Sequence, residues 1–226
     1  MSAISHDWAV IFDVDGVLLE LTRAEEELFF YPFASRVDAG KLSRDWNSYA
    51  IRNDEEIVKE IVARYGLPPG EAQTITHEYL GLLEKELAAR CIISEVIAGA
   101  DELLASLEGQ ARLGIATANF RRAAELRLRQ VSLWDPVSGL AHGADGGGPK
   151  SDILARAIAA SGLPSSQIIF VGDNVTDVQA GLVNKTHFIG FSFGARRREA
   201  LRQAGAARLS ADHADTARHI QDILGA

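Results

Sequence analysis

Residues 8–17, WAVIFDVDGV, decide the fold, because an apolar run leads directly into two aspartates and a glycine. A short apolar run bounded by a turn residue is typical of a buried strand. Asp13 and Asp15 are two positions apart, so their side chains start on the same face of the chain. Gly16 lets the backbone turn sharply close to a bound ligand. Open α/β sheets carry their ligand chemistry after such strands, so this stretch predicts an α/β fold with a reactive site.

The two neighbouring carboxylates limit the chemistry of that site. Two like charges this close do not both stay ionised cheaply unless a cation lies between them or one is protonated. The first solution is a hard oxygen-ligand site for Mg²⁺, and the second is a nucleophile beside a general acid. An Asp-Gly turn that merely caps the next segment is the structural alternative.

Polar residues also follow other apolar runs of the chain, at 113–116 and 168–171. A helical pattern after the three glycines at 146–148 opens with Lys150. If a helix begins near Asn174, Asp177 falls in its first turn, where the helix dipole favours a carboxylate. The residues placed in this way are Thr117, Asn119, Lys150, Asp173 and Asp177. With Asp13 and Asp15 they form a distributed set of the kind that binds Mg²⁺ and a phosphoryl group together.

The order of these motifs resembles the haloacid dehalogenase-like superfamily of Mg²⁺-dependent phosphohydrolases. The matching pattern is Asp-x-Asp-Gly, then Thr after a strand, then Lys, then Gly-Asp-x-x-x-Asp, and it spans residues 8–194. Each motif is weak alone, whereas their joint spacing is specific. The chain is most similar to the branch with an α-helical cap, which includes phosphoglycolate phosphatases and beta-phosphoglucomutases. The resemblance implies Mg²⁺ as the cofactor and a small phosphorylated metabolite as the substrate.

The resemblance also implies a role for each motif residue. Asp13 would be the nucleophile that becomes an aspartyl phosphate, and Asp15 the general acid and base. Thr117 and Lys150 would hold the phosphoryl oxygens, with Gly16, Ala118 and Asn119 beside the bound substrate. Mg²⁺ would be bound by Asp13, Asp173 and the backbone carbonyl of Asp15, with Asp177 contributing directly or through water.

Two details refine this implied activity. Asp15 argues for phosphate esters, because an alkoxide leaving group needs a proton whereas carbon–halogen cleavage needs none. Many relatives have proline after the motif lysine, but here Ser151 follows Lys150. Lys150 is still expected to fill the role, because it opens a helix at the expected place.

The segment between residues 19 and 93 lacks strand-like runs and shows helical patterns. Residues 53–56, NDEE, offer a capping-box start ahead of an apolar stripe that includes Ile57 and Ile61. From residue 99 onward, helical patterns alternate with apolar runs, which indicates crossover units and a parallel sheet. We therefore expect a doubly wound, Rossmann-like α/β core formed by residues 1–18 and 94–226, with an α-helical cap domain at 19–93 inserted after the first strand.

The expected cap contains a cluster of residues suited to substrate recognition. An arginine fork and an indole are able to grip an anionic or ring-bearing substrate tail. On this chemistry alone, Arg52 and Trp46 are predicted to bind the substrate. Their neighbours in the cluster are Arg44, Asn47 and Tyr49. Cap packing and solvated charge are the structural alternative for each of them.

Composition fits a cytoplasmic enzyme. The 226 residues are 47% hydrophobic and 24% charged, which is ordinary for a globular protein. The first residues show no basic segment before an apolar stretch, and no apolar run approaches the length of a membrane span. A formal net charge of -8 argues against nucleic acid as a partner. We expect the protein to bind neither nucleic acid nor a membrane. The dense basic run at 196–198 is expected to be a solvated helix face.

Three other functions compete with the phosphatase interpretation. Residues 190–194, GFSFG, match the G-x-S-x-G motif of an α/β-hydrolase esterase with Ser192 as nucleophile, and Asp212 and His213 follow. This alternative leaves little chain for further strands and gives Asp13 and Asp15 no role. A receiver domain, phosphorylated on aspartate as a switch, is about half this length and has no helical insert. A phosphomutase uses the same nucleophile, and the sequence does not separate it from a phosphatase.

Overall fold

The computed structural model describes residues 7–38 and 40–225, and its core is a six-stranded parallel sheet. The strand order is β5-β4-β1-β6-β7-β8. In that order the strands are Ala141–His142, Arg112–Ala116, Ala9–Phe12, Ile168–Gly172, His187–Phe191 and Arg208–Ser210. The expected parallel α/β core is confirmed. Residues 1–6 and 226 belong to the predicted core but lie outside the described residues. The prediction about the first residues of the chain therefore falls mostly outside them too.

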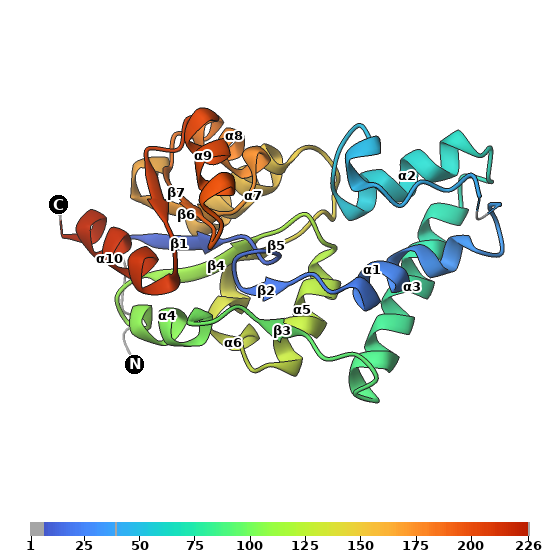
Figure 1. Cartoon of the computed structure of the whole chain (residues 1–226), viewed down its shortest axis with the longest axis horizontal. Helices are drawn as coiled ribbons and strands as arrows, with labels where there is room; N and C mark the ends of the chain where they lie inside the picture. Colours follow the sequence, from blue (N-terminus) through green and yellow to red (C-terminus); the bar gives the residue numbers. More distant parts are fainter. Residues whose placement is uncertain (1–6, 39, 226) are drawn as a thin grey trace.

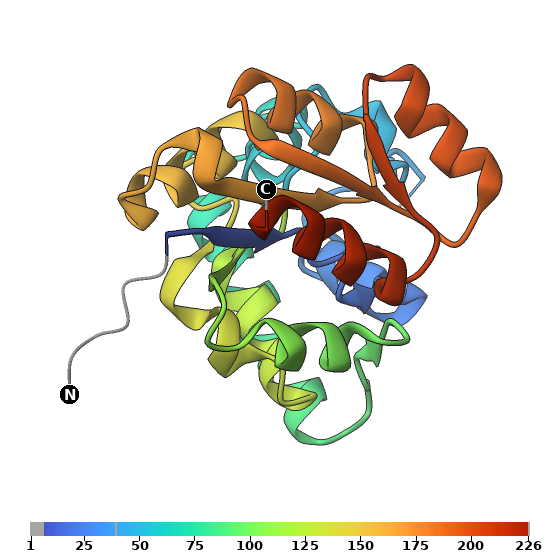
Figure 2. The ribbon, with the colours of Figure 1, turned by 90° about the vertical axis from the view of Figure 1, so that its left-hand side faces the viewer.

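Helices cover both faces of this sheet (Figure 2). The side chains of β1 alternate between the faces, with Val10 and Phe12 in one hydrophobic cluster and Ala9 and Ile11 in the other. The first cluster contains side chains of α4 (Ala100–Leu107), α5 (Arg121–Gln130), α6 (Trp134–Val137) and α10 (His213–Leu224). The second contains side chains of α7 (Lys150–Ser161), α8 (Val175–Val183) and α9 (Ala195–Gln203). All four β1 residues are fully buried, which explains their continuous apolar sequence.

A helical segment is inserted between β1 and β4 and lies at one end of the sheet (Figure 1). The chain enters it through β2 (Leu19–Glu20) and leaves it through β3 (Glu95–Val96), and these two short strands pair antiparallel. Between them lie α1 (Arg23–Phe30), α2 (Asp54–Arg64), α3 (Glu71–Ala88) and two short 3-10 helices at Tyr31–Phe33 and Trp46–Ser48. The three α-helices share a hydrophobic cluster, which includes Phe33, Ile57 and Tyr79 and continues into the core through Phe120 and Ala123.

The expectation that no strand lies within residues 19–93 is wrong at β2. This strand has two residues, and its partner β3 is more than seventy positions away, so no local periodicity marks either of them. The expected start of α2 is confirmed, because the Asn53 side chain accepts a hydrogen bond from the Glu56 amide at 2.9 Å. No helix among the described residues is long and apolar enough to cross a bilayer.

Candidate active site

Sheet topology brings the predicted site residues to one place. β1 lies between β4 and β6, and Asp13, Thr117 and Asp173 follow the carboxyl ends of these three parallel strands. A cavity of about 580 Å³ opens at this edge of the sheet. Every predicted site residue lines it, namely Asp13, Asp15, Gly16, Trp46, Arg52, Thr117, Ala118, Asn119, Lys150, Asp173 and Asp177. The structure thus brings together side chains that are up to 164 positions apart in the sequence.

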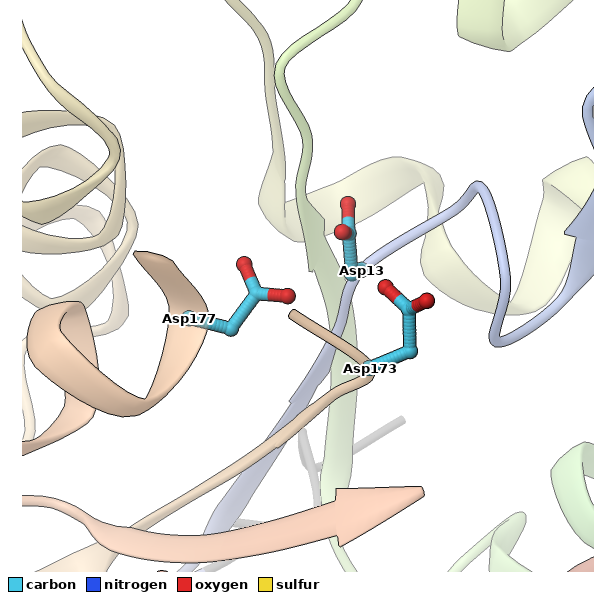
Figure 3. A group of neighbouring side chains, drawn as sticks. All are labelled: Asp13, Asp173 and Asp177. Carbon is cyan, nitrogen blue, oxygen red and sulfur yellow. The ribbon is translucent and has the colours of Figure 1, made fainter. Parts of the chain in front are cut away.

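Three aspartates form a compact acidic cluster in this cavity (Figure 3). Asp13, Asp173 and Asp177 each place a carboxylate oxygen within 4.8 Å of the others. Asp13 is fixed by its amide, which donates to the Val171 carbonyl at 2.9 Å, because the β1–β6 ladder continues past the strand end. Asp177 lies in the first turn of α8, as expected, and its Oδ2 accepts from the Asn174 amide at 3.0 Å.

A buried lysine partly offsets this concentration of negative charge. Lys150 Nζ lies 2.8 Å from Asp13 Oδ1 and 2.9 Å from Asp177 Oδ1. Burial would lower the pKa of Lys150, but the two carboxylates together raise it, so the ammonium stays charged. Burial, with a further contribution from Asp177 and Asp173, raises the pKa of Asp13 well above its usual range in spite of Lys150. Burial and Asp177 likewise raise the pKa of Asp173 to about 6.

The acidic cluster suits a divalent cation. Its donors are all carboxylate oxygens, the type of ligand that Mg²⁺ takes in proteins. Asp177 Oδ1 is buried, and apart from its ion pair with Lys150 it has no hydrogen-bond partner among the described residues. The raised pKa values of Asp13 and Asp173 show that negative charge here is costly without a further cation. The residues present therefore fit the expected metal.

Asp15 lies beside this cluster, and both oxygens of its carboxylate are engaged elsewhere. Its Oδ1 accepts from Arg127 Nη1 at 2.7 Å, and its Oδ2 accepts from Asn119 Nδ2 at 2.9 Å. The side chain of Asp15 is therefore held at the cavity wall and does not belong to the cluster of metal donors. The predicted contact of its backbone carbonyl with the metal stays a prediction.

Gly16 has a positive φ of 80° and lies against Asp173. A Cβ atom at this position would come within 2.4 Å of Asp173 Oδ2. The glycine is therefore required both for the turn and for the place of a carboxylate of the acidic cluster. Thr117 is almost fully buried, and its hydroxyl accepts from the Asn119 amide at 3.2 Å, so the loop after β4 turns its polar groups toward the cavity.

The start of α2 rests on the two loops that carry Thr117 and Lys150. Asp54 donates its amide to the Ala118 carbonyl, and its Oδ2 accepts from the Phe120 amide at 2.8 Å. Burial raises the pKa of Asp54 to about 8. Asn53 Nδ2 donates to the Gly148 carbonyl at 2.7 Å, and Glu55 accepts from backbone amides of the same glycine loop. The insert is thus bonded to the backbone of the cavity itself.

Part of the expected recognition cluster faces the cavity. Trp46, Tyr49 and Arg52 line it, and Trp46 Nε1 donates to Glu26 Oε1 at 3.2 Å. Arg44 and Asn47 are exposed and do not line it. For these two residues the structure favours the alternative of solvated surface positions.

Two arginines of the site were not identified from the sequence. Arg197 was expected to be part of a solvated helix face, but its Nη2 donates to Asp173 Oδ2 at 2.7 Å and its Nε to the Asp173 carbonyl. Arg127 is 2% exposed and bonds to Asp15. Both stand in arginine-rich helices, RRAAELRLRQ and ARRREALRQ, where no local signal separates the buried or paired arginine from its neighbours.

The residues of the esterase alternative do not assemble into a triad. Ser192 Oγ accepts from the Gly194 amide at 3.2 Å. His213 stacks on Phe191 and bonds through Nε2 to the Val17 carbonyl at 2.8 Å, while Asp212 caps α10. No hydrogen bond among the described residues joins Ser192 to a histidine, so the nucleophile has no base.

Comparisons with known proteins agree with this geometry. The family of haloacid dehalogenase-like hydrolases matches residues 9–183, and a second group, described as HAD-hydrolase-like, matches residues 146–222. The match covers most of the chain, so this protein belongs to the haloacid dehalogenase-like hydrolase family, and the resemblance seen in the sequence is confirmed. No curated protein sequence matches it.

Solved structures with the same fold include enzymes of this family. CbbY from Rhodobacter sphaeroides, in complex with phosphate, is 20% identical with a TM-score of 0.71 over 91% of this chain and 94% of CbbY. A phosphatase assigned by prediction in Clostridium acetobutylicum is 20% identical with a TM-score of 0.68, over 96% of this chain and 100% of that one. A candidate beta-phosphoglucomutase from Bacteroides vulgatus is 18% identical with a TM-score of 0.70, over 97% and 90%.

Gly16→Ala tests the fit between the turn and the acidic cluster. Its Cβ would displace Asp173, so we expect Mg²⁺ affinity to fall by about tenfold or more, together with a stability loss of roughly 1–2 kcal/mol from the positive φ. Titration calorimetry and urea unfolding measure the two effects. Gly162→Ala is the matched control, since Gly162 has a φ of 69° and no atom within 4 Å of the added Cβ. Unchanged Mg²⁺ affinity in Gly16→Ala would contradict this description of the site.

Proposed function

We propose that this protein is a Mg²⁺-dependent phosphohydrolase that removes phosphate from a small phosphorylated metabolite through an aspartyl phosphate on Asp13. The observation that carries the proposal is the cluster of Asp13, Asp173 and Asp177 around the buried ammonium of Lys150, on the wall of one cavity. Phosphoryl transfer requires mainly positioning and neutralisation of charge on the phosphoryl oxygens, and this arrangement supplies both.

Each side chain has a distinct part in the proposed reaction. Asp13 attacks phosphorus, which divides hydrolysis into the formation and the breakdown of an acyl phosphate. Lys150 and the Thr117 hydroxyl hold the phosphoryl oxygens. Asp15 gives a proton to the leaving alcohol and later takes one from the attacking water. When bound by Asp13, Asp173, Asp177 and the Asp15 carbonyl, Mg²⁺ supplies positive charge to the phosphoryl group.

We propose that the helical insert is a cap domain, residues 19–93, over a core of residues 1–18 and 94–226. Its entry and exit through paired strands support this division, as does a hydrophobic cluster formed mostly by its own helices. Trp46 and Arg52 reach the cavity from the insert, so they are suited to contact the part of the substrate beyond the phosphate. Closure of such a cap excludes water and admits only small substrates.

A phosphomutase is the second proposal. The likeness to a candidate beta-phosphoglucomutase supports it only at the level of the fold. CbbY was also solved with xylulose-(1,5)bisphosphate, which is consistent with a sugar phosphate as substrate here. The two activities differ in whether water or a sugar hydroxyl accepts the phosphoryl group from Asp13, so release of inorganic phosphate separates them.

Asp13→Asn is expected to keep the fold and to lose turnover by about 10³-fold or more, because an amide is a far poorer nucleophile and metal ligand. A panel of metabolite phosphates, assayed with and without Mg²⁺, measures the effect. Wild-type activity should also disappear in excess chelator. Retained turnover in the variant would contradict the role of Asp13, and retained turnover in chelator would contradict the role of Mg²⁺. Ser192→Ala is the companion variant, and we expect a change of less than about threefold, whereas an esterase would be silenced.

Substitutions of Asp15 and of Lys150 are expected to change the dependence of rate on the leaving group in different ways. Asp15→Asn should slow alkyl phosphates by about 10²–10⁴-fold but an activated aryl phosphate far less, because general acid help matters most for a basic leaving oxygen. Lys150→Gln should slow both substrates alike, by about 10²–10³-fold, because it acts on phosphoryl charge. Steady-state rates on a series of leaving groups measure this. Equal losses across the series for Asp15→Asn would count against its role as acid.

Substrate size tests the cap. We expect turnover of small phosphorylated metabolites, no detectable activity on folded phosphoproteins, and roughly a tenfold rise in KM for the preferred metabolite in Arg52→Ala or Trp46→Ala. Arg44→Ala is the matched control outside the cavity. Comparable kcat/KM on a phosphoprotein and on the best metabolite would refute the closed cap, while unchanged kinetics in both variants would refute only these two contacts.

A further inference from the structure

Arg127 of α5 is a buried cation that the proposed reaction does not use. Its side chain is 2% exposed, yet it makes five hydrogen bonds, as many as a guanidinium has N–H groups. Burial would lower the pKa of Arg127, but Asp15 and Glu25 together raise it, so it remains fully charged. A fully satisfied buried arginine specifies a fixed arrangement of its partners more than it adds stability.

One edge of the guanidinium contacts two residues that line the cavity. Nη1 donates to Asp15 Oδ1 at 2.7 Å and to Asn119 Oδ1 at 3.1 Å. Asn119 in turn donates through Nδ2 to the other oxygen of Asp15 at 2.9 Å. The three side chains form a closed ring in which each carboxylate oxygen of Asp15 has its own donor. Arg127 therefore fixes the position of Asp15 and also the orientation of the Asn119 amide.

The other edge faces the insert. Nε donates to Glu25 Oε1 at 2.7 Å, and Nη2 donates to the Glu20 carbonyl at 3.0 Å. Glu25 lies in the first turn of α1, and Glu20 lies in β2, where the chain enters the insert. Glu25 is itself held, because its Oε2 accepts from the Thr22 amide and its Oε1 accepts from the Ser94 hydroxyl. A movement of α1 relative to the sheet would therefore pull on Arg127.

We infer that Arg127 is a positioning residue that sets the orientation of Asp15 and ties it to α1, so that proton transfer by Asp15 depends on where the insert lies. The inference rests on the proposed function, in which Asp15 is the acid. Arg127 does not line the cavity, so it acts through Asp15 and Asn119 and not on the substrate directly. Its loss should therefore affect leaving groups that need a proton and spare those that do not.

The test is Arg127→Lys, with rates measured for an alkyl phosphate and for 4-nitrophenyl phosphate. Lysine keeps the charge but does not bridge Asp15, Glu25 and the Glu20 carbonyl at once. We expect kcat for the alkyl phosphate to fall by about 10–100-fold and kcat for the aryl phosphate by less than about threefold, with KM nearly unchanged.

Two further variants separate this role from a merely structural one. Glu25→Gln leaves Arg127 one acceptor short without touching Asp15 directly, and it should give the same selective loss at smaller size. It also carries the test if Arg127→Lys does not fold. Arg129→Lys is the matched control, because Arg129 lies on the same helix, is 52% exposed and pairs with Glu125. We expect it to change no rate by more than about twofold.

Equal losses for both substrates in Arg127→Lys, or no loss in either, would overturn the inference. A selective loss in Arg127→Lys without one in Glu25→Gln would overturn the tie to α1. Failure of the proposed function would look different, because the wild-type protein would then show no Mg²⁺-dependent turnover of either phosphate.

Discussion

The structure depends on the repulsion among three carboxylates at the end of β1. Asp13, Asp173 and Asp177 are held together by the parallel pairing of β1 with β6 and by the first turn of α8, not by attraction for one another. Lys150 and Arg197 offset part of this charge, yet burial and the neighbouring carboxylates still raise the pKa values of Asp13 and Asp173. Such a cluster stores electrostatic free energy that a bound cation relieves, and the cation in turn makes the site able to accept an anionic phosphoryl group.

The insert contacts the core at the same edge of the sheet. The loops that carry Thr117 and Lys150 expose backbone amides and carbonyls at the sheet edge, and the start of α2 satisfies several of them through Asn53, Asp54 and Glu55. Arg127 makes a second connection between the same edge and α1. The loops that carry the proposed phosphoryl-binding residues therefore share hydrogen bonds with the segment proposed to close over them.

The sequence predicts the parts of the site that follow strands, because an apolar run that ends in a polar residue is a local signal. Asp13, Thr117 and Asp173 were found in this way, and all line the cavity. Strands β2, β3, β5 and β8 are two or three residues long and are defined by distant partners, so no periodicity marks them. Arg127 and Arg197 were missed for a related reason, since their partners are 112 and 24 positions away and their own helices are rich in arginine.

We propose that Asp13 carries the phosphoryl group during turnover. The most direct measurement is to quench the enzyme in steady state with its best phosphate ester, reduce it with borohydride and sequence the modified peptide by mass spectrometry. An acyl phosphate is reduced to an alcohol, whereas a free carboxylate is not. We expect homoserine at position 13, and none in enzyme that was quenched without substrate. Turnover with no reduced residue, or with reduction at Asp15 or Asp173 in place of Asp13, would contradict it.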